Sequence, residues 1–330
     1  MPHEGQTMNT YLVETDDLER EAEGRGTRIG LALGSGGARG WAHIGVINAL
    51  RDAGIEPEII CGTSIGSLVG AAHLGGILPQ LTEWAENLSR LGLLRYLDIR
   101  MLGGGFIAGR KLQDMLDDAL GDAKIEDLER RFIAVATDLT TGHEVWLRKG
   151  LLAEAAWASF ALPGIFPPVL RHKQLLVDGA LVNPIPVSAC RAMGARLVIA
   201  VNLNTDHLGR KPINGQLPEQ SESETVPVEP ENEGKVTGML KQFLGLNNPE
   251  MGLVSVMASS LNIIQDRLTR IRLAGDPPDV TISPHVGNIA LLEFNRAKEA
   301  IEEGERAVQI ALPSLWEAMD ILGIPKPPPR

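Results

Sequence analysis

The chain has 330 residues, of which 44% are hydrophobic and 22% charged, a composition typical of a globular protein with a sizeable core. Its formal net charge of −11 argues against a nucleic-acid partner, because binding to a phosphate backbone requires a basic surface. Two cysteines, Cys61 and Cys190, are too few for a disulfide framework, and both lie in apolar stretches typical of buried thiols.

The acidic charge is concentrated in two segments. Residues 1–26 hold seven acids and two arginines, and residues 216–234 hold six acids and no base, which leaves the rest of the chain near neutral. We predict a disordered acidic tail at 1–26 and a Pro/Glu/Ser-rich linker or mobile loop at 205–250. The N-terminus lacks the apolar region of a signal peptide, and no run of 18 apolar residues occurs. We therefore expect a cytoplasmic protein whose contact with the inner membrane surface is peripheral.

Buried strands alternate with helices from residue 27 onward. Apolar runs at 28–34 and 57–64 predict strands, and the segments 39–54 and 65–76 predict helices. This order indicates βαβ units and a mostly parallel sheet, with residues 27–204 forming the core. The same patterns predict further strands at 131–139, 143–148, 174–183 and 196–203, and a helix at 151–160.

Residues 251–330 are predicted to form C-terminal helices that pack on the core. One helix carries an apolar stripe at 3,4 spacing, which predicts packing against the rest of the chain and, as the alternative, a coiled coil that would make a homo-oligomer. The stripe consists of Val254, Met257, Leu261, Ile264, Leu268 and Ile271. Two final helices, at 292–312 and 314–322, are expected to be separated by Pro313.

The strongest chemical signal is a G-x-S-x-G motif centred on Ser64, from Gly62 to Gly66. A nucleophilic serine must project from a tight turn, and the motif stands where that turn is needed, between a buried strand and a helix. The two glycines remove Cβ atoms that would collide in such a turn. The alternative is a chance pattern around a serine that caps a helix, which the strand–helix context disfavours.

A glycine-rich loop, Gly34-Ser35-Gly36-Gly37-Ala38-Arg39-Gly40, follows the first predicted strand directly. Its backbone N–H groups and the start of the next helix can hold a phosphate or the oxyanion of an acyl-transfer intermediate. The G-x-G-x-x-G dinucleotide pattern fails, because Arg39 or Ser35 occupies a required glycine position. No P-loop sequence is present either. We therefore favour an oxyanion-binding loop.

A third signal is Asp178-Gly179-Ala180, at the end of the apolar segment QLLV. A carboxylate at a strand terminus can reach a neighbouring site, although Asp-Gly alone is a common turn. The three motifs occur in the order oxyanion loop, G-x-S-x-G and D-G-A. This combination is more specific than any one of the motifs alone.

In these motifs the chain resembles the patatin-like phospholipase family, in particular its small bacterial and neuropathy-target-esterase-type members. The resemblance runs from about Arg28 to Leu203, roughly half of the chain, and includes LALGSGGARGWAHIGVINAL, CGTSIGSLVGAA, SFALPGIFPPV and LVDGALVNPIPV. It implies a three-layer α/β/α fold and a serine acyl hydrolase that cleaves carboxylic esters of lipids through a Ser–Asp dyad and an acyl-enzyme. It implies no cofactor and no metal.

The family's functional residues carry over by position. Ser64 matches the nucleophile and Asp178 the general base. The oxyanion loop corresponds to Gly36, Gly37, Ala38 and Arg39, and the supporting glycines to Gly34, Gly40, Gly62, Gly66 and Gly179. Ser35 departs from the glycine of many members, but two adjacent glycines remain.

Several alternatives stay open. A Ser–Asp–His triad would need a histidine after the acid, which leaves His207 and His285. The domain could also be catalytically idle and serve as a regulatory, partner-binding protein, or it could transfer the acyl group to an acceptor other than water. The apolar, glycine-rich segment 91–109, with Arg95 and Arg100, is either a lid near lipid headgroups or a surface loop packed on the core.

Overall fold

The computed structural model describes residues 28–88, 110–204 and 253–327. The predicted tail at 1–26, the segment 91–109 with its two arginines, and the linker at 205–250 lie outside these residues. None of the helices within the described ranges has the length and apolar character needed to cross a bilayer.

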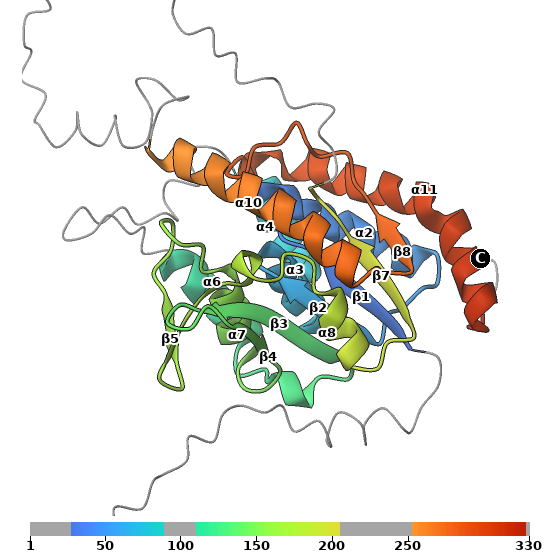
Figure 1. Ribbon diagram of the computed structural model, residues 1–330, viewed down its shortest axis with the longest axis horizontal. Helices are drawn as coiled ribbons and strands as arrows, with labels where there is room; N and C mark the ends of the chain where they lie inside the picture. Colours follow the sequence, from blue (N-terminus) through green and yellow to red (C-terminus); the bar gives the residue numbers. More distant parts are fainter. Residues whose placement is uncertain (1–27, 89–109, 205–252, 328–330) are drawn as a thin grey trace, which may run out of the picture.

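A central sheet forms the frame of the described residues. Its order is β5-β6-β3-β2-β1-β7-β8, and β4 also pairs with β3 (Figure 1). The strands from β3 to β8 along this order are parallel, whereas β4, β5 and β6 join by antiparallel pairing. The strands are β1 (Ile29–Leu33), β2 (Ile59–Thr63), β3 (Arg131–Asp138), β4 (Glu144–Leu147), β5 (Val169–Arg171), β6 (Gln174–Asp178), β7 (Leu197–Val201) and β8 (Val280–Ile282).

Helices cover both faces of the sheet, as Figure 1 shows, because the central strands are apolar on both sides. Leu31 and Leu33 belong to the larger cluster, and Ala32 belongs to the smaller one. The larger cluster is closed by α2 (Ala42–Asp52), α3 (Ile65–Leu74), α4 (Leu78–Glu86), α6 (Arg110–Leu120), α7 (Leu152–Phe160) and α11 (Ala297–Leu322). The smaller one is closed by α8 (Val187–Ala192) and, through Leu273, by α10 (Leu253–Gly275). The predicted three-layer α/β/α fold is confirmed.

Most predicted elements are present, with shifted ends. The helix expected at 39–54 is a 3₁₀ turn, η1 (Gly37–Trp41), followed by α2. The strand expected at 174–183 ends at Asp178, because the Asp178 side chain accepts a hydrogen bond from the backbone N–H of Ala180 and starts the turn η3 (Gly179–Leu181). Two more short turns are η2 (Ile125–Asp127) and η4 (Phe294–Arg296).

The predicted break at Pro313 is wrong, because α11 runs without interruption through that residue. Proline removes one backbone hydrogen bond, to the carbonyl of the residue four positions earlier, which here is Gln309. Both Pro313 and Gln309 are exposed, so water can satisfy the freed carbonyl. Buried side chains before and after the proline, such as Val308 and Leu315, hold both halves on the core.

The predicted packing of the apolar stripe of α10 is wrong for two of its residues, whereas Leu261 and Leu268 are half-buried. The helix is present, but Ile264 and Ile271 are 51% and 68% exposed, whereas Gln265 and Thr269 are buried. The polar side chains of α10 face inward because they bind polar groups beside the glycine-rich loop, as described below. The side chains of Val254 and Met257 lie outside the described set.

Candidate active site

Ser64 occupies a sharp turn between β2 and α3. Its backbone has φ 58° and ψ −126°, a conformation that L-residues adopt only where the surroundings impose it. The turn is tight on both sides, because a Cβ at Gly62 would overlap the backbone of Ser67 and one at Gly66 would overlap the carbonyl of Leu33. This geometry is that of a nucleophile elbow, which projects the hydroxyl from the carboxyl end of the sheet.

Asp178 brings its carboxylate to this hydroxyl from the end of β6. Ser64 Oγ donates a hydrogen bond to Asp178 Oδ2 at 2.5 Å, and the Ala180 N–H donates to Asp178 Oδ1 at 2.8 Å. A Cβ at Gly179 would overlap the carbonyl of Val135, so the glycine lets β6 end close against β3. The second and third motifs therefore meet at one point, although 114 positions separate the two residues.

The carboxyl group of Asp178 is fully buried, and Ser64 is 5% exposed. Burial raises the pKa of Asp178 to about 7, while the hydrogen bonds from Ser64 and Ala180 act in the opposite direction. A carboxylate with such a pKa is a stronger base than an exposed aspartate. The site can therefore take a proton from a serine hydroxyl near neutral pH.

No imidazole fits between Ser64 and Asp178, because their oxygen atoms are already in hydrogen-bond contact. Of the two candidate triad histidines, His285 is exposed and His207 lies outside the described residues. A different histidine, His43, is buried below the glycine-rich loop, with Nε2 2.7 Å from the carbonyl oxygen of Gly34. Burial lowers the pKa of His43 to about 4, so it is neutral and supports the loop as a hydrogen-bond donor.

The glycine-rich loop packs against the start of α3, directly behind the serine. A Cβ at Gly40 would overlap the side chain of Ile65, and a Cβ at Gly34 would come within 2.7 Å of the carbonyl oxygen of Val201. The N–H of Ala38 donates to the carbonyl of Leu291 at 2.8 Å, and the N–H of Arg39 donates to the carbonyl of Gly36 at 3.3 Å. Two of the four residues predicted for the oxyanion loop thus use their N–H groups within the fold.

The N–H groups of Gly36 and Gly37 are the loop donors with no acceptor among the described residues. Gly37 has φ +56°, and a side chain there would collide with Leu291, so only glycine fits this turn. Gly36 and Gly37 are therefore the predicted donors best able to bind an oxyanion.

Arg39 anchors the loop from beneath. Its side chain is 2% exposed and donates to Asn204 Oδ1 at 3.2 Å and to Asn262 Oδ1, on α10, at 2.5 Å. Gln265, also on α10, lies 3.5 Å from the hydroxyl of Ser35. The loop is thus held by a helix more than 200 residues further along the chain.

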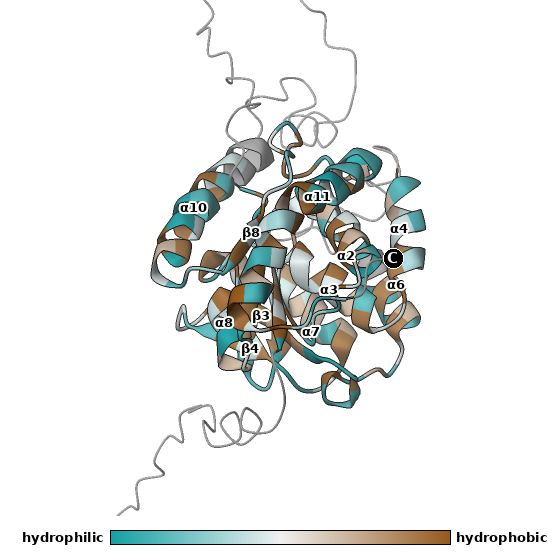
Figure 2. Cartoon of the chain, turned by 90° about the vertical axis from the view of Figure 1, so that its right-hand side faces the viewer, coloured by the Kyte–Doolittle hydropathy of each residue, from teal (hydrophilic) through white to brown (hydrophobic). Residues whose placement is uncertain are grey.

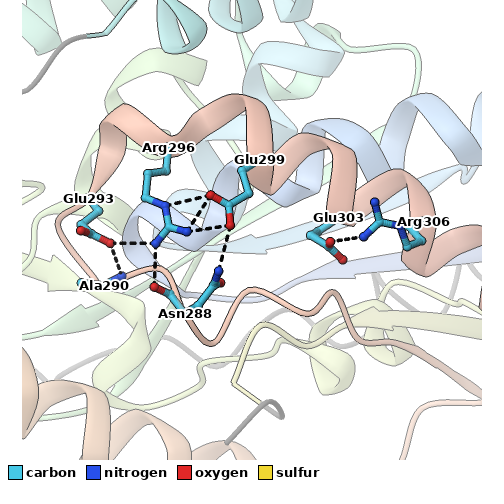
Figure 3. Close-up of polar contacts among 7 residues, drawn as sticks. All are labelled: Asn288, Ala290, Glu293, Arg296, Glu299, Glu303 and Arg306. Carbon is cyan, nitrogen blue, oxygen red and sulfur yellow. Dashed lines mark hydrogen bonds and ion pairs between the residues drawn. The ribbon is translucent and has the colours of Figure 1, made fainter. Parts of the chain in front are cut away.

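The segment that supplies the Leu291 carbonyl is fixed by Arg296 at the start of α11 (Figure 3). The guanidinium donates to the carbonyl of Asn288 at 2.7 Å and forms a two-pronged ion pair with Glu299 and a further one with Glu293. The Glu299 carboxylate raises the pKa of Arg296, so the guanidinium remains charged. This network braces the far side of the glycine-rich loop.

Sequence reasoning missed the hydroxyl groups that hold the turn. Ser159 on α7 accepts a hydrogen bond from the Ser64 N–H at 2.9 Å and donates to the carbonyl of Val135 at 2.5 Å. Thr137 donates to the Asp178 carbonyl, and Thr63 donates to the Asn183 carbonyl, both at 2.8 Å. The one available signal was a hydroxyl within a mostly apolar segment, such as Ser159 in LAEAAWASF.

The described residues contain no group of three or more His, Cys, Asp or Glu side chains placed to hold a metal ion. Cys61 and Cys190 are both buried thiols, as their apolar surroundings in the sequence predicted.

Comparison with known proteins identifies a matching family model and several similar proteins. The model of the patatin-like phospholipase family matches residues 31–191. An uncharacterised NTE family protein of Mycobacterium tuberculosis is 34% identical, over 86% of this chain and 91% of that protein. Lysophospholipase NTE1 of Yarrowia lipolytica is 34% identical over 203 residues, which are 60% of this chain and 14% of the larger protein.

A solved structure with the same fold is VipD from Legionella pneumophila. The superposition has a TM-score of 0.51 and 13% identity, and it covers 88% of this chain and 67% of VipD. At that identity the likeness concerns the fold alone. The family model and the mycobacterial relatives matched over 91% of their length go further: this chain belongs to the NTE family of proteins with a patatin-like phospholipase domain.

Proposed function

We propose that this protein is a lipolytic serine hydrolase in which Ser64 attacks a carboxylic ester and Asp178 acts as its general base. Membership of the patatin-like phospholipase and NTE families supports lipid acyl hydrolysis in general. The observation that carries the dyad is the 2.5 Å hydrogen bond from Ser64 Oγ to a fully buried carboxylate.

In the proposed first step, Asp178 Oδ2 accepts the proton of Ser64 as Oγ bonds to the ester carbonyl carbon. The carbonyl oxygen becomes an oxyanion, which the N–H groups of Gly36 and Gly37 stabilise. When the tetrahedral intermediate collapses, the bond to the alcohol breaks, and the protonated Asp178 returns its proton to the departing oxygen. An acyl-enzyme on Ser64 remains.

In the second step, water attacks the acyl-enzyme, and Asp178 again takes the proton. As this second tetrahedral intermediate collapses, the bond between Ser64 Oγ and the acyl carbon breaks, Asp178 returns the proton to Oγ, and the fatty acid leaves. The raised pKa of Asp178 suits both halves of the cycle, because the group must release and accept a proton near neutral pH. Since one carboxylate performs both transfers, no imidazole is required.

The test is hydrolysis of a panel of esters, from water-soluble short-chain esters to lysophospholipids, phospholipids and triacylglycerols. Wild type should release fatty acid from at least one lipid ester, and Ser64→Ala and Asp178→Asn should lower kcat by about 10³-fold or more. Ser67→Ala is the matched control, because Ser67 is a buried serine in the first turn of α3 whose hydroxyl contacts the Ala156 carbonyl and not Asp178.

Product analysis distinguishes the remaining functions. Release of free fatty acid supports hydrolysis, whereas transfer of the acyl group to an added alcohol or lysolipid in preference to water would replace hydrolase with acyltransferase. Turnover of none of the esters by a folded wild-type protein would contradict the proposal and favour a partner-binding role.

A further inference from the structure

Helix α10 presents three isoleucines to solvent. Ile263, Ile264 and Ile271 are 54%, 51% and 68% exposed, whereas Gln265 and Thr269 on the opposite side are 3% and 1% exposed. A surface helix of a globular protein normally buries its apolar face. In Figure 2, α10 forms one margin of the molecule and carries brown, hydrophobic bands between teal ones.

The outward side of α10 is also basic. Residues 259–275 contain three arginines and one acid, Asp266, in a chain whose net charge is −11. Arg272 faces inward, where it pairs with Glu144, so the outward side carries two of the three arginines. At 3.6 residues per turn, Arg267 and Arg270 fall on the same third of the helix circumference as the exposed isoleucines. Both arginines are exposed. Arg270 is 63% exposed while it pairs at 3.3 Å with Asp266, which is 15% exposed.

The inward side of α10 is bound to the glycine-rich loop and its surroundings. Asn262 contacts Arg39, Gln265 contacts Ser35, and Thr269 lies 3.5 Å from Asn204. Further along, Arg272 donates to the carbonyl of Val182. These contacts explain why the polar face is buried, and they place the outward face one helix diameter, about 10 Å, from the loop side.

We propose that the outward face of α10, formed by Ile263, Ile264, Arg267, Arg270 and Ile271, docks on an anionic lipid surface. Exposed apolar side chains interleaved with arginines are the features of a helix that lies in a membrane interface, where apolar groups enter the acyl region and arginines meet phosphates. The inference rests on the proposed lipolytic function, because docking brings the glycine-rich loop to the surface that holds the substrate.

A second copy of this chain is the less suitable occupant. A symmetric dimer brings the same patch of both copies together. On this face it would oppose arginines to arginines, with Asp266 largely buried as the one acid of residues 259–275. An anionic lipid surface supplies the negative charge that the same face of a second copy lacks.

The experiment is co-sedimentation of the full-length chain with vesicles of phosphatidylcholine and phosphatidylglycerol in equal amounts, in a Ser64→Ala background that leaves the lipid intact. The triple variant Ile263→Asn, Ile264→Asn, Ile271→Asn should bind at least about tenfold more weakly than the parent. The double variant Ile310→Asn, Ile321→Asn is the matched control, since these α11 isoleucines are 65% and 76% exposed. It should bind as the parent does.

Charge is tested by Arg267→Glu and by vesicles of phosphatidylcholine alone, both of which should weaken binding. Thermal melting of each variant shows that it is folded. The proposal is overturned if the folded parent does not sediment with the anionic vesicles, if the triple variant sediments as well as the parent, or if light scattering shows a dimer that only the triple variant dissociates.

The proposed function has a separate readout, which is turnover of a water-soluble ester by the protein with Ser64 intact. Vesicle binding without turnover would contradict the hydrolase and leave the docking surface standing. Turnover without vesicle binding would support the hydrolase and contradict the docking surface.

Discussion

At the scale of single residues, the site combines two features that cost folding free energy. Ser64 holds a backbone conformation in which a side chain is strained, and Asp178 is an acid with no exposure to water. Both are maintained by their neighbours, through the hydrogen bonds of Ser159 and Ala180. Such costs are expected at a reactive site, where residues are held in an arrangement that is not the most stable one for folding.

The pH dependence of turnover should report Asp178. With a pKa raised to about 7, the basic carboxylate form is scarce at pH 5 and predominant at pH 8. We expect kcat/KM for a soluble ester to rise about tenfold per pH unit below the pKa and to level off above it. A flat profile between pH 5 and pH 8 would contradict the assignment of Asp178 as the base.

The same ionisation should appear in stability. The folded pKa of about 7 lies above the value near 3.9 of an unfolded aspartate, so the native state binds more protons between these values, and the free energy of unfolding falls as pH rises. Asp178→Asn cannot ionise. Its stability relative to wild type should therefore increase from pH 5 to pH 8, by up to about 3 kcal/mol. Melting curves that show the same difference in stability between the two proteins at pH 5 and at pH 8 would refute the linkage.

Residue-scale prediction from the sequence reached the groups that carry motifs. Ser64 was named because glycines mark the turn around it, and Asp178 because its D-G-A motif follows the other two motifs in the order of the patatin-like family. Ser159 and Asn262 belong to no motif, and a serine in a mostly apolar helix or an amide in a polar one does not indicate which group it binds. Their positions follow from the tertiary fold, which brings α7 and α10 to the turn and the loop.

At the scale of elements, α3 and α7 form the support of the nucleophile. Two buried serines link them in different ways: Ser159 binds the backbone of Ser64, whereas Ser67 binds the carbonyl of Ala156. Removing either hydroxyl leaves a buried polar group without its partner, which costs about 1–3 kcal/mol.

Ser159→Ala and Ser67→Ala should accordingly lower the free energy of unfolding by similar amounts. Only Ser159→Ala should also lower kcat, by about tenfold or more, because it releases the N–H that fixes the Ser64 turn. Chemical denaturation and steady-state kinetics of the two variants provide the comparison. Equal kcat values for the two would show that the turn does not depend on Ser159.

Element-scale prediction succeeded where the apolar pattern was continuous and failed where packing decided the outcome. Strands such as β1 and β7 are apolar throughout and were recognised. The short strands β5 and β8 and the helices α4 and α6 were not recognised, and the prediction that Ile264 and Ile271 of α10 would be buried was wrong. In α10 the polar side chains of Gln265 and Asn262 face inward because they bind Ser35 and Arg39. The spacing of apolar residues along the sequence contains no information about such partners.

At the scale of the molecule, the C-terminal helix α11 packs in the same hydrophobic core as the elements that carry the site, although it lies beyond the segment matched by the family model. It crosses α2 at two glycines: a Cβ at Gly304 would overlap the carbonyl of Ala42, and one at Gly45 would overlap the carbonyl of Ile301. The backbones therefore touch at the crossing, and α11 also carries the network around Arg296.

Gly304→Ala should force the two helices apart and lower the free energy of unfolding by about 1–3 kcal/mol. Gly275→Ala is the control, because a Cβ at Gly275 meets nothing within 4 Å. Thermal melting would distinguish them. Equal melting temperatures for the two variants would mean that α11 does not pack on α2 as closely as described.

The central claim is that Asp178 activates Ser64 directly, and covalent labelling tests it most directly. A fluorophosphonate should modify wild type at one residue, and peptide mass spectrometry should locate the label on Ser64. We predict that Asp178→Asn, while folded, reacts at least about 10²-fold more slowly, because Oγ has lost its proton acceptor. Labelling of Asp178→Asn at the wild-type rate, or a label on a residue other than Ser64, would contradict the account.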